Sequence, residues 1–477
     1  MKYTLTPVAV VINQLQSALR LQSRGFLRMG LTAAAMAAAS PSHAIDFGPD
    51  GMFSFNGFGQ ATVGQHGSRC FMTLPQYNNQ PTDCQFADPL GSKQLNWTEQ
   101  PMPNQPIKTV TTLAYQAQPW LGAKFDLGKG YKLAGLLSQR WRDDTVDGQI
   151  PYSYRASKES VPGFWFEKNL ALSHEDYGRL TVGHMTTRSW HEADYPYGGN
   201  VGLSEAWSAS GAGYGMLTSA IRYQSRLIDF YNGDLVLEAT YDMGNTNFTK
   251  NKPQFIELYG KYYRGPLELD VILQDTKNGG PGAWGQTPFT AQSQNTTDDV
   301  WLSGTSQGVA IVMARYWVNN QLELSGGLRR NSWSGAGAKY NQTAGTLIQT
   351  SLFNVDWNTT NADGSSPAYS ATSYDVMLGA RYRVGKWMPS IGLVHLGTAS
   401  TDNTYDHGQG NSALFGVLGL QYDHGNGLTV DVQAGAVHFA RLGQSPLSMP
   451  SNTSFSGVDS RFSQDGRWFT VQMTYSF

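Results

Sequence analysis

Two sets of charged residues in this chain could act on ions, and neither has the arrangement of a catalytic centre. The first is a basic row on one face of a predicted strand: Lys132, Arg140 and Arg142. The second is acidic and lies in the stretch Ser189–Met216: Glu192, Asp194 and Glu205. Fixed charges beside a narrow path with low-dielectric walls attract or repel passing ions more strongly than charges on an open surface. The plain alternative is that charged side chains line any water-filled interior by default.

Motifs for covalent or metal chemistry do not accompany these charges. The sequence has no H-E-x-x-H, no phosphate-binding Gly-Lys loop and no zinc spacing. The nine histidines are scattered, which favours structural roles, and Asp402–Asp406 lacks the spacing of a calcium loop. We therefore expect no catalytic residues, no metal and no cofactor, and we do not expect an enzyme.

The element that the chain is built around is its last eleven residues, Arg467–Phe477. Odd positions from Phe469 to Phe477 are apolar, including Tyr475, and even positions from Thr470 are polar. Strict alternation predicts a β-strand with a different solvent on each face, and the length suits a tilted strand that crosses a bilayer. An exposed end strand invites aggregation, so we expect this strand to pair with the first strand and close a barrel.

The same alternation recurs along the chain, with tight turns and long connections in turn. The dipeptide Asn232-Gly233 is a strong hairpin signal among these turns. An even strand number with short periplasmic turns and long outer loops is typical of an outer-membrane barrel, and sixteen strands are enough to leave an aqueous channel. The predicted strands are Met52–Val63, Thr109–Phe125, Tyr131–Trp141, Phe164–Ser173, Arg179–Arg188, Leu217–Phe230, Leu235–Met243, Gln254–Tyr263, Leu267–Thr276, Gly308–Trp317, Leu322–Asn331, Tyr374–Val384, Ser390–Thr398, Ser412–Asp423, Leu428–Arg441 and Arg467–Phe477.

Composition agrees with a barrel of this kind. The 477 residues include 53 Gly, 24 Tyr, 21 Phe and 13 Trp, with 15% charged residues. Many glycines suit many turns, and many aromatics suit girdles at the two membrane interfaces. A mean hydropathy of −0.37 is compatible with spanning strands, because half of each strand faces water.

The first 44 residues have the features of a cleaved leader. They contain four basic residues and no acid, then a small apolar stretch at Met29–Ala39 and the cleavage-like end Ser42-His43-Ala44. We expect a signal peptide over 1–44, cleavage after Ala44 and a single barrel domain over 45–477. Removing the four charges from 34 basic residues leaves 30 against 36 acidic residues, near −6, which argues against a nucleic-acid partner.

Cys70 and Cys84 are the two cysteines of the chain. In an exported protein, a pair at short spacing predicts a disulfide, with two free thiols as the alternative. The bridge would close a loop of about fifteen residues and contribute roughly 3 kcal/mol by the chain-entropy relation.

Three passages give the chain a resemblance to a known family. They are the strand–turn–strand passage Phe166–His184, the alternation Tyr374–Tyr382 and the terminal Phe477. Together with the strand plan they resemble the Gram-negative general porins, particularly those of β-proteobacteria. His184 stands where that family usually carries Arg, and Ala171 where it often has Gly. The Pro-Glu-Phe-Gly element of enteric porins is absent, so no constriction residue is transferred from the family.

The resemblance implies a homotrimer of all-β, sixteen-stranded antiparallel transmembrane barrels, each pore narrowed by its third outer loop. That loop is Ser189–Met216, so we expect its three acids to stand across the lumen from Arg140 and Arg142. We expect a bacterial outer-membrane porin that passes small hydrophilic solutes and ions by passive diffusion. It would contact outer-membrane lipid and the outer-membrane assembly machinery, and that machinery would recognise Tyr475 and Phe477 as an assembly signal. A substrate-selective channel with a solute site in the lumen, and a barrel enzyme or adhesin, are the alternatives.

Overall fold

The computed structural model describes the strands and much of the third long connection. The described residues are 45–69, 107–146, 150–151, 167–207, 216–243, 254–277, 306–336, 339–341, 346–348, 369–398, 400–401, 412–440 and 465–477. The predicted leader and the predicted pair Cys70 and Cys84 lie outside them.

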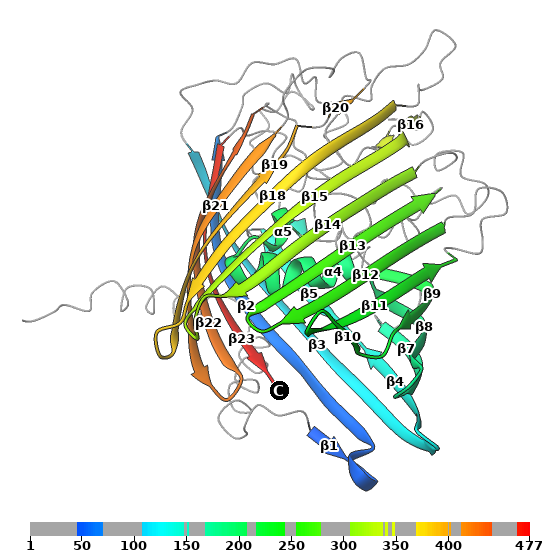
Figure 1. Cartoon of the computed structure of the whole chain (residues 1–477). Helices are drawn as coiled ribbons and strands as arrows, with labels where there is room; N and C mark the ends of the chain where they lie inside the picture. The colour runs from blue at the N-terminus through cyan, green and yellow to red at the C-terminus, as the bar shows by residue number, and fades with distance from the viewer. Residues whose placement is uncertain are drawn as a thin grey trace, which may run out of the picture.

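The described strands form a closed antiparallel barrel with sixteen strand positions (Figure 1). One position is shared by β4 and β5, which follow each other along β3. This confirms the predicted fold class. The barrel strands are β2 (Phe53–Arg69), β3 (Ile107–Gly128), β4 (Tyr131–Ser138) with β5 (Trp141–Val146), β7 (Glu167–His174), β8 (Gly178–Thr186), β9 (Met216–Gln224), β11 (Gly233–Asp242), β12 (Gln254–Arg264), β13 (Leu267–Lys277), β14 (Ser306–Trp317), β15 (Leu322–Ala336), β18 (Tyr369–Tyr382), β19 (Trp387–Leu396), β21 (Ala413–Gly425), β22 (Leu428–Phe439) and β23 (Asp465–Ser476).

Several short elements extend this barrel. The strand β1 pairs with the start of β2, and β10 lengthens the hairpin that leads into β11. β6 pairs with β5, β20 pairs with β18, and β16 and β17 form a small separate hairpin. Their bounds are β1 (Ile45–Phe47), β6 (Ile150–Pro151), β10 (Ile228–Phe230), β16 (Lys339–Asn341), β17 (Thr346–Ile348) and β20 (Ser400–Thr401), with a 3₁₀ turn η1 (Pro49–Gly51) after β1.

The barrel closes where the last strand meets the first, as the sequence predicts. In the β2–β23 pair Val63 lies opposite Val471. The terminal residue completes the seam, because Phe477 N donates to Gly57 O and Gly57 N donates to Phe477 O, both at 2.9 Å. No sheet edge is left open along this seam, so the aggregation hazard of an unpaired strand is removed.

The two faces of the closing strand confirm the predicted alternation. Phe469 and Met473 are 44% and 50% exposed on the outer surface. Gln472, Thr474 and Ser476 line a cavity inside the barrel. The same exposed apolar surface continues on the other strands, for example at Leu418, which is the outward face that lipid would cover.

The Asn-Gly hairpin forms one residue earlier than the dipeptide suggests. Phe230 pairs with Gly233, so the two turn residues are Tyr231 and Asn232. Both have positive φ, 45° and 60°, as a type I′ turn requires. Gly233 is the first strand residue, and a Cβ there would lie 2.4 Å from Tyr263 O. The dipeptide therefore supplies the second turn residue and a position where the neighbouring backbone approaches closely.

The third long connection folds into the barrel, as expected from the resemblance. Its described part, residues 187–207, is here called the inward loop. It contains α4 (Arg188–Glu192), the helical turns η4 (Ala193–Gly198) and η5 (Gly199–Val201), and α5 (Ser204–Trp207). Figure 1 shows α4 and α5 inside the ring of strands. Among the described residues, no helix is long and apolar enough to cross a membrane.

The inward loop packs on the barrel wall through an apolar core inside the barrel. From the loop this core takes Tyr197, Val201, Leu203 and Trp207, each at most 1% exposed. The wall contributes inward-facing residues of eight strands: Tyr259, Ile272, Val309, Ile311, Met313, Met377, Val394, Leu396, Ala413, Phe415, Val417, Val437 and Trp468. Burial of this apolar surface holds the loop against one side of the barrel.

Deleting Phe477 should reduce the yield of folded barrel. The deletion removes both hydrogen bonds to Gly57 and the ring contact with Phe55, whose centroid lies 5.4 Å from that of Phe477. Refolding into lipid vesicles, followed by the heat-modifiable shift of the folded barrel on gels, measures the yield. Phe477→Tyr keeps the ring and the backbone pairing and serves as the control. A deletion variant that folds at the wild-type yield would contradict this role of the terminal residue.

Candidate functional site

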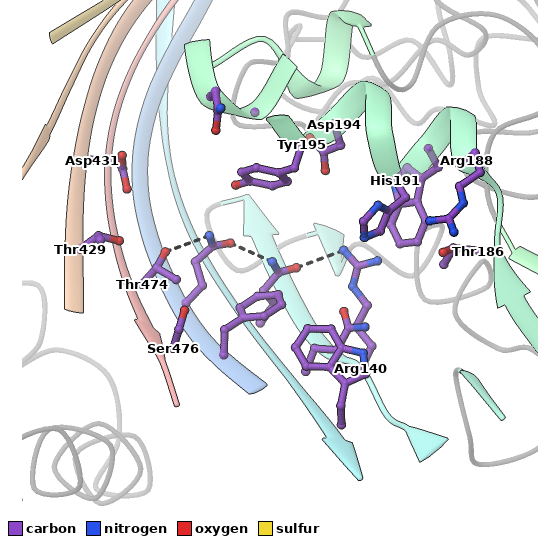
Figure 2. A pocket seen from close by; sticks show the side chains of 18 of the residues that line it. Arg140, Thr186, Arg188, His191, Asp194, Tyr195, Thr429, Asp431, Thr474 and Ser476 are labelled. Carbon is purple, nitrogen blue, oxygen red and sulfur yellow. Dashed lines mark hydrogen bonds between the residues drawn. The ribbon is translucent and has the colours of Figure 1, made fainter. Parts of the chain in front are cut away.

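A cavity of about 730 Å³ lies in the barrel interior between the inward loop and the wall. Its wall residues come chiefly from β2, β3, β4, β7–β9 and β21–β23, and the inward loop contributes residues of α4, η4 and η5, among them Asp194 and Tyr195 (Figure 2). The volume falls within the range of about 300–1,000 Å³ that small-molecule sites occupy.

The start of α4 is bound to the wall by two acidic side chains. The carboxylate of Glu257 accepts hydrogen bonds from Arg188 N at 2.8 and 3.0 Å and from Ser189 N at 3.3 Å. Glu238 accepts a two-point contact from the Arg188 guanidinium, at 2.6 Å from Nε and 2.7 Å from Nη2. Thr187 caps the helix by accepting from Trp190 N. These charge-assisted bonds fix where the loop leaves β8.

A second group of contacts binds the end of α4 and the turn η4. Lys261 Nζ lies 3.4 Å from Glu192 and 2.8 Å from Glu268. Asp270 accepts hydrogen bonds from the hydroxyls of Tyr197 at 2.7 Å and Tyr259 at 2.6 Å. Each of these three carboxylates has a cationic or hydroxyl partner, which offsets the cost of burying it.

Glu192 belongs to this attachment of the loop and does not line the cavity. Burial alone would raise the pKa of Glu192, but the hydrogen bond from His191 and the charges of Lys261 and Arg188 lower its pKa to about 2. The sequence-based expectation placed Glu192 across the lumen from Arg140. The structure instead turns its carboxylate toward Lys261 on β12, because that cation and Arg188 lie beside it.

The end of the inward loop is held by Trp207. Its indole Nε1 lies 3.4 Å from Met313 Sδ, and the Arg329 guanidinium stands 4.6 Å from the centroid of its ring. Arg329 also donates to Trp207 O and pairs with Asp375 at 2.8 Å. The loop is thus attached at its start to β11 and β12, at its middle to β12 and β13, and at its end to β14 and β15.

Arg140 and Asp194 line the same cavity, one from the wall and one from the inward loop (Figure 2). Arg140 lies between β4 and β5, where its Nη2 donates to Gln116 at 3.3 Å and its guanidinium stands 5.2 Å from the Trp190 ring centroid. Asp194 accepts a hydrogen bond from Ser204 Oγ. A basic group and an acidic group are thereby fixed in one aqueous space.

Of the remaining predicted site residues, Lys132 lies outside the cavity, and Arg142 and Glu205 are located by the strand and the helix that contain them. Lys132 is exposed beside the turn between β3 and β4 and does not line the cavity. Arg142 falls in β5 and Glu205 in α5. Sequence reasoning did not single out two loop residues that line the cavity, His191 and Tyr195. It also passed over a set of glutamines whose inward orientation follows from the strand register.

The charges that line the cavity are of both signs and come from the wall and the loop. Arg188 and Arg222 lie 2.6 and 3.8 Å from Glu238, so part of this charge is already paired. The basic lining residues are Arg140, Arg179, Arg188, Arg222 and Arg381, and the acidic ones are Glu167, Asp194, Glu238 and Asp431.

One pentapeptide has the spacing of a hydrolase nucleophile, Gly304-Thr-Ser-Gln-Gly308. Ser306 is the first residue of β14 and pairs with Lys277 and Ser334 on the neighbouring strands. A nucleophile elbow needs a sharp strand-to-helix turn at this serine, and Ser306 does not lie in one. Within the described ranges, no group of three or more His, Cys, Asp or Glu side chains could hold a metal ion.

Comparison with known proteins gives a likeness in structure. No protein-family model and no curated protein sequence matches this chain. The anion-selective porin from Comamonas acidovorans superposes with a TM-score of 0.50 at 14% identity, over 89% of this chain and 99% of that one. OmpF of Salmonella typhi, in complex with daunomycin, has a TM-score of 0.49 at 14% identity, over 91% and 100%. The outer-membrane protein OmpT of Vibrio cholerae has 0.49 at 13%, over 91% and 100%. This chain therefore has the closed, sixteen-stranded barrel fold seen in the Comamonas porin.

Proposed function

We propose that this protein is an outer-membrane porin, a water-filled channel for the passive diffusion of small hydrophilic solutes and ions. The observation that carries this proposal is the closed barrel with an apolar outer face, a polar cavity of about 730 Å³ and an inward loop that narrows it. The fold shared with an anion-selective porin supports the same reading. As an extension of the proposal, the mature chain begins at Ile45 and assembles as a homotrimer in the bacterial outer membrane.

Passive conduction suits the way the inward loop is held. Its three attachments use charge-assisted hydrogen bonds at Glu257, ion pairs at Lys261 and an apolar contact at Trp207. Such a loop makes a fixed constriction, because moving it would expose buried charges and apolar surface together.

The test is the conductance of the purified protein in a planar lipid bilayer. A porin gives stepwise current increases that are proportional to voltage and to bulk salt conductivity. A barrel that inserts without conducting would exclude the channel function and favour an adhesin or enzyme.

We infer that Arg140 and Asp194 set a transverse field in the constriction, so each should act on the zero-current potential in a salt gradient. Arg140→Gln removes a lumenal cation and should move the potential toward cation preference. Asp194→Asn removes a lumenal anion and should move it toward anion preference, because the nearby fixed charge sets the local ion concentration.

Lys132→Gln is the matched control, since Lys132 is exposed outside the cavity and should leave the potential unchanged. Both effects should shrink at high salt, because screening shortens to about 3 Å at 1 M. If the zero-current potentials of the Arg140 and Asp194 variants both equal that of the wild type, the charges that determine ion selectivity lie elsewhere in the barrel.

A substrate-selective channel is the second candidate function. The observation that favours it is a neutral, hydrogen-bonding sector of the cavity wall that faces an exposed tyrosine of the inward loop.

A further inference from the structure

The cavity lining is divided into a charged side and a neutral side. The arginines and acids come mainly from β7–β9, β11, the inward loop and Arg140 between β4 and β5. Across the cavity, β2, β3 and β21–β23 present mainly amides and hydroxyls, and the charged residues on that side are Asp431 and Arg381 of β18. The amides of this neutral sector are named here the glutamine wall: Gln60, Gln116, Gln118, Gln421, Gln433 and Gln472.

Hydrogen bonds between neighbouring strands orient part of the glutamine wall. Gln116 Nε2 donates to Gln60 Oε1 at 2.9 Å, and Gln60 Nε2 donates to Thr474 Oγ1 at 3.2 Å (Figure 2). Arg140 donates to Gln116 Oε1 at the other end of this chain. An amide has two N–H groups and two carbonyl lone pairs, so each glutamine in the chain retains a donor and an acceptor for a solute.

An aromatic ring of the inward loop faces the same space. The Tyr195 side chain is 54% exposed and extends from the loop into the cavity (Figure 2). Its ring packs on Gly199, where an added Cβ would lie 2.9 Å from Tyr195 Cζ. Because the glycine lets the ring lie this close to the backbone, the loop supports one side of the ring. On the wall, Phe58 and Trp120 form an aromatic pair with centroids 5.7 Å apart.

We propose that the glutamine wall and Tyr195 form a binding subsite for a neutral, polyhydroxylated solute, such as a short saccharide. Hydroxyl groups both donate and accept, which matches amides better than it matches arginines or carboxylates. Pyranose rings also carry apolar C–H faces that pack on an aromatic ring, and Tyr195 offers one. This inference rests on the proposed channel function and adds a preferred solute class to it.

The test is solute-induced blockage of single-channel current, with maltose as the probe. Wild-type channels should show brief, concentration-dependent interruptions in maltose, and fewer in a polyethylene glycol of similar mass, which fills space with few hydroxyls. Because the two amides each offer hydrogen bonds to the solute, the double variant Gln60→Leu/Gln116→Leu should shorten the residence time of maltose about tenfold.

Two further variants separate the subsite from a general change in the pore. Tyr195→Ala should also shorten the interruptions, whereas Tyr195→Phe should retain them because the ring remains. Gln224→Leu is the matched control: Gln224 lines the cavity from β9, on the charged side, and its replacement should leave maltose blockage unchanged.

The same recordings distinguish the two proposals. A conducting channel that maltose does not interrupt, or that polyethylene glycol interrupts equally, overturns the saccharide subsite and leaves the porin function in place. Unchanged residence times in the Gln60/Gln116 double variant also overturn it. A protein that does not conduct removes the proposed function itself.

Discussion

Replacing Trp207 with alanine should release the end of the inward loop and widen the channel. Trp207 is fully buried, and its replacement removes the contacts with Met313 and with the Arg329 guanidinium. Removing a buried aromatic of this size costs about 3–5 kcal/mol, because the surrounding side chains only partly fill the space. That loss falls on the attachment of the loop, since Trp207 joins the loop to β14 and β15.

Single-channel conductance and its fluctuations measure the effect. We expect Trp207→Ala to conduct more and with noisier open current than wild type, while the barrel still forms. Trp207→Phe is the control, because it keeps a large aromatic ring at the same place in the apolar core. If the two variants have equal conductance and noise, the apolar core does not set the width of the channel.

Replacing Asp375 with alanine should destabilise the barrel strongly. Asp375 is 1% exposed, and its Oδ2 accepts from Arg329 Nε at 2.9 Å and Asn331 Nδ2 at 2.8 Å, while Oδ1 accepts from Gly397 N at 3.0 Å. Removing it leaves the buried Arg329 charge without its counter-ion, which costs about 3–5 kcal/mol. The temperature at which the folded, heat-modifiable band disappears should fall accordingly.

The double variant Arg329→Leu/Asp375→Leu distinguishes loss of a partner from loss of the pair. Replacing a buried ion pair by apolar residues is often close to neutral, although here Trp207 O also loses a donor, at about 1–3 kcal/mol. We expect the double variant to be more stable than Asp375→Ala. A double variant less stable than the single one would show that Arg329 contributes mainly through its contacts with the loop.

The strand pattern could be predicted from sequence because the two faces of a barrel strand meet different environments, an apolar one outside and a polar one inside. A period of two in Phe469, Val471 and Met473 is a local property, and the tight turns between strands are local as well. Closure followed from the same argument, since a fully formed end strand needs a partner. The Asn232-Gly233 dipeptide predicted the hairpin but not which residues form its turn. Gly233 lies in the strand, where it is needed because Tyr263 O of the next strand approaches closely.

The interior could be predicted only in part. The register predicts that Arg140 faces the interior, and Arg140 lines the cavity with Asp194. It could not show that Glu192 turns away to Lys261, since that choice depends on a residue about seventy positions distant. Nor could it show that Met313, Met377 and Phe415, although inward, lie in a dry core.

The sequence by itself determined the barrel, its closing seam at Phe477 and which side chains face inward, because alternation and turns are short-range. Only the tertiary structure decided which inward side chains meet water. The inward loop covers part of the wall with Trp207 and leaves Gln60 and Gln116 on the cavity, and this coverage depends on contacts between segments that are remote in the chain. The physical reason is that burial is a property of the assembled interior, whereas alternation is a property of a single strand.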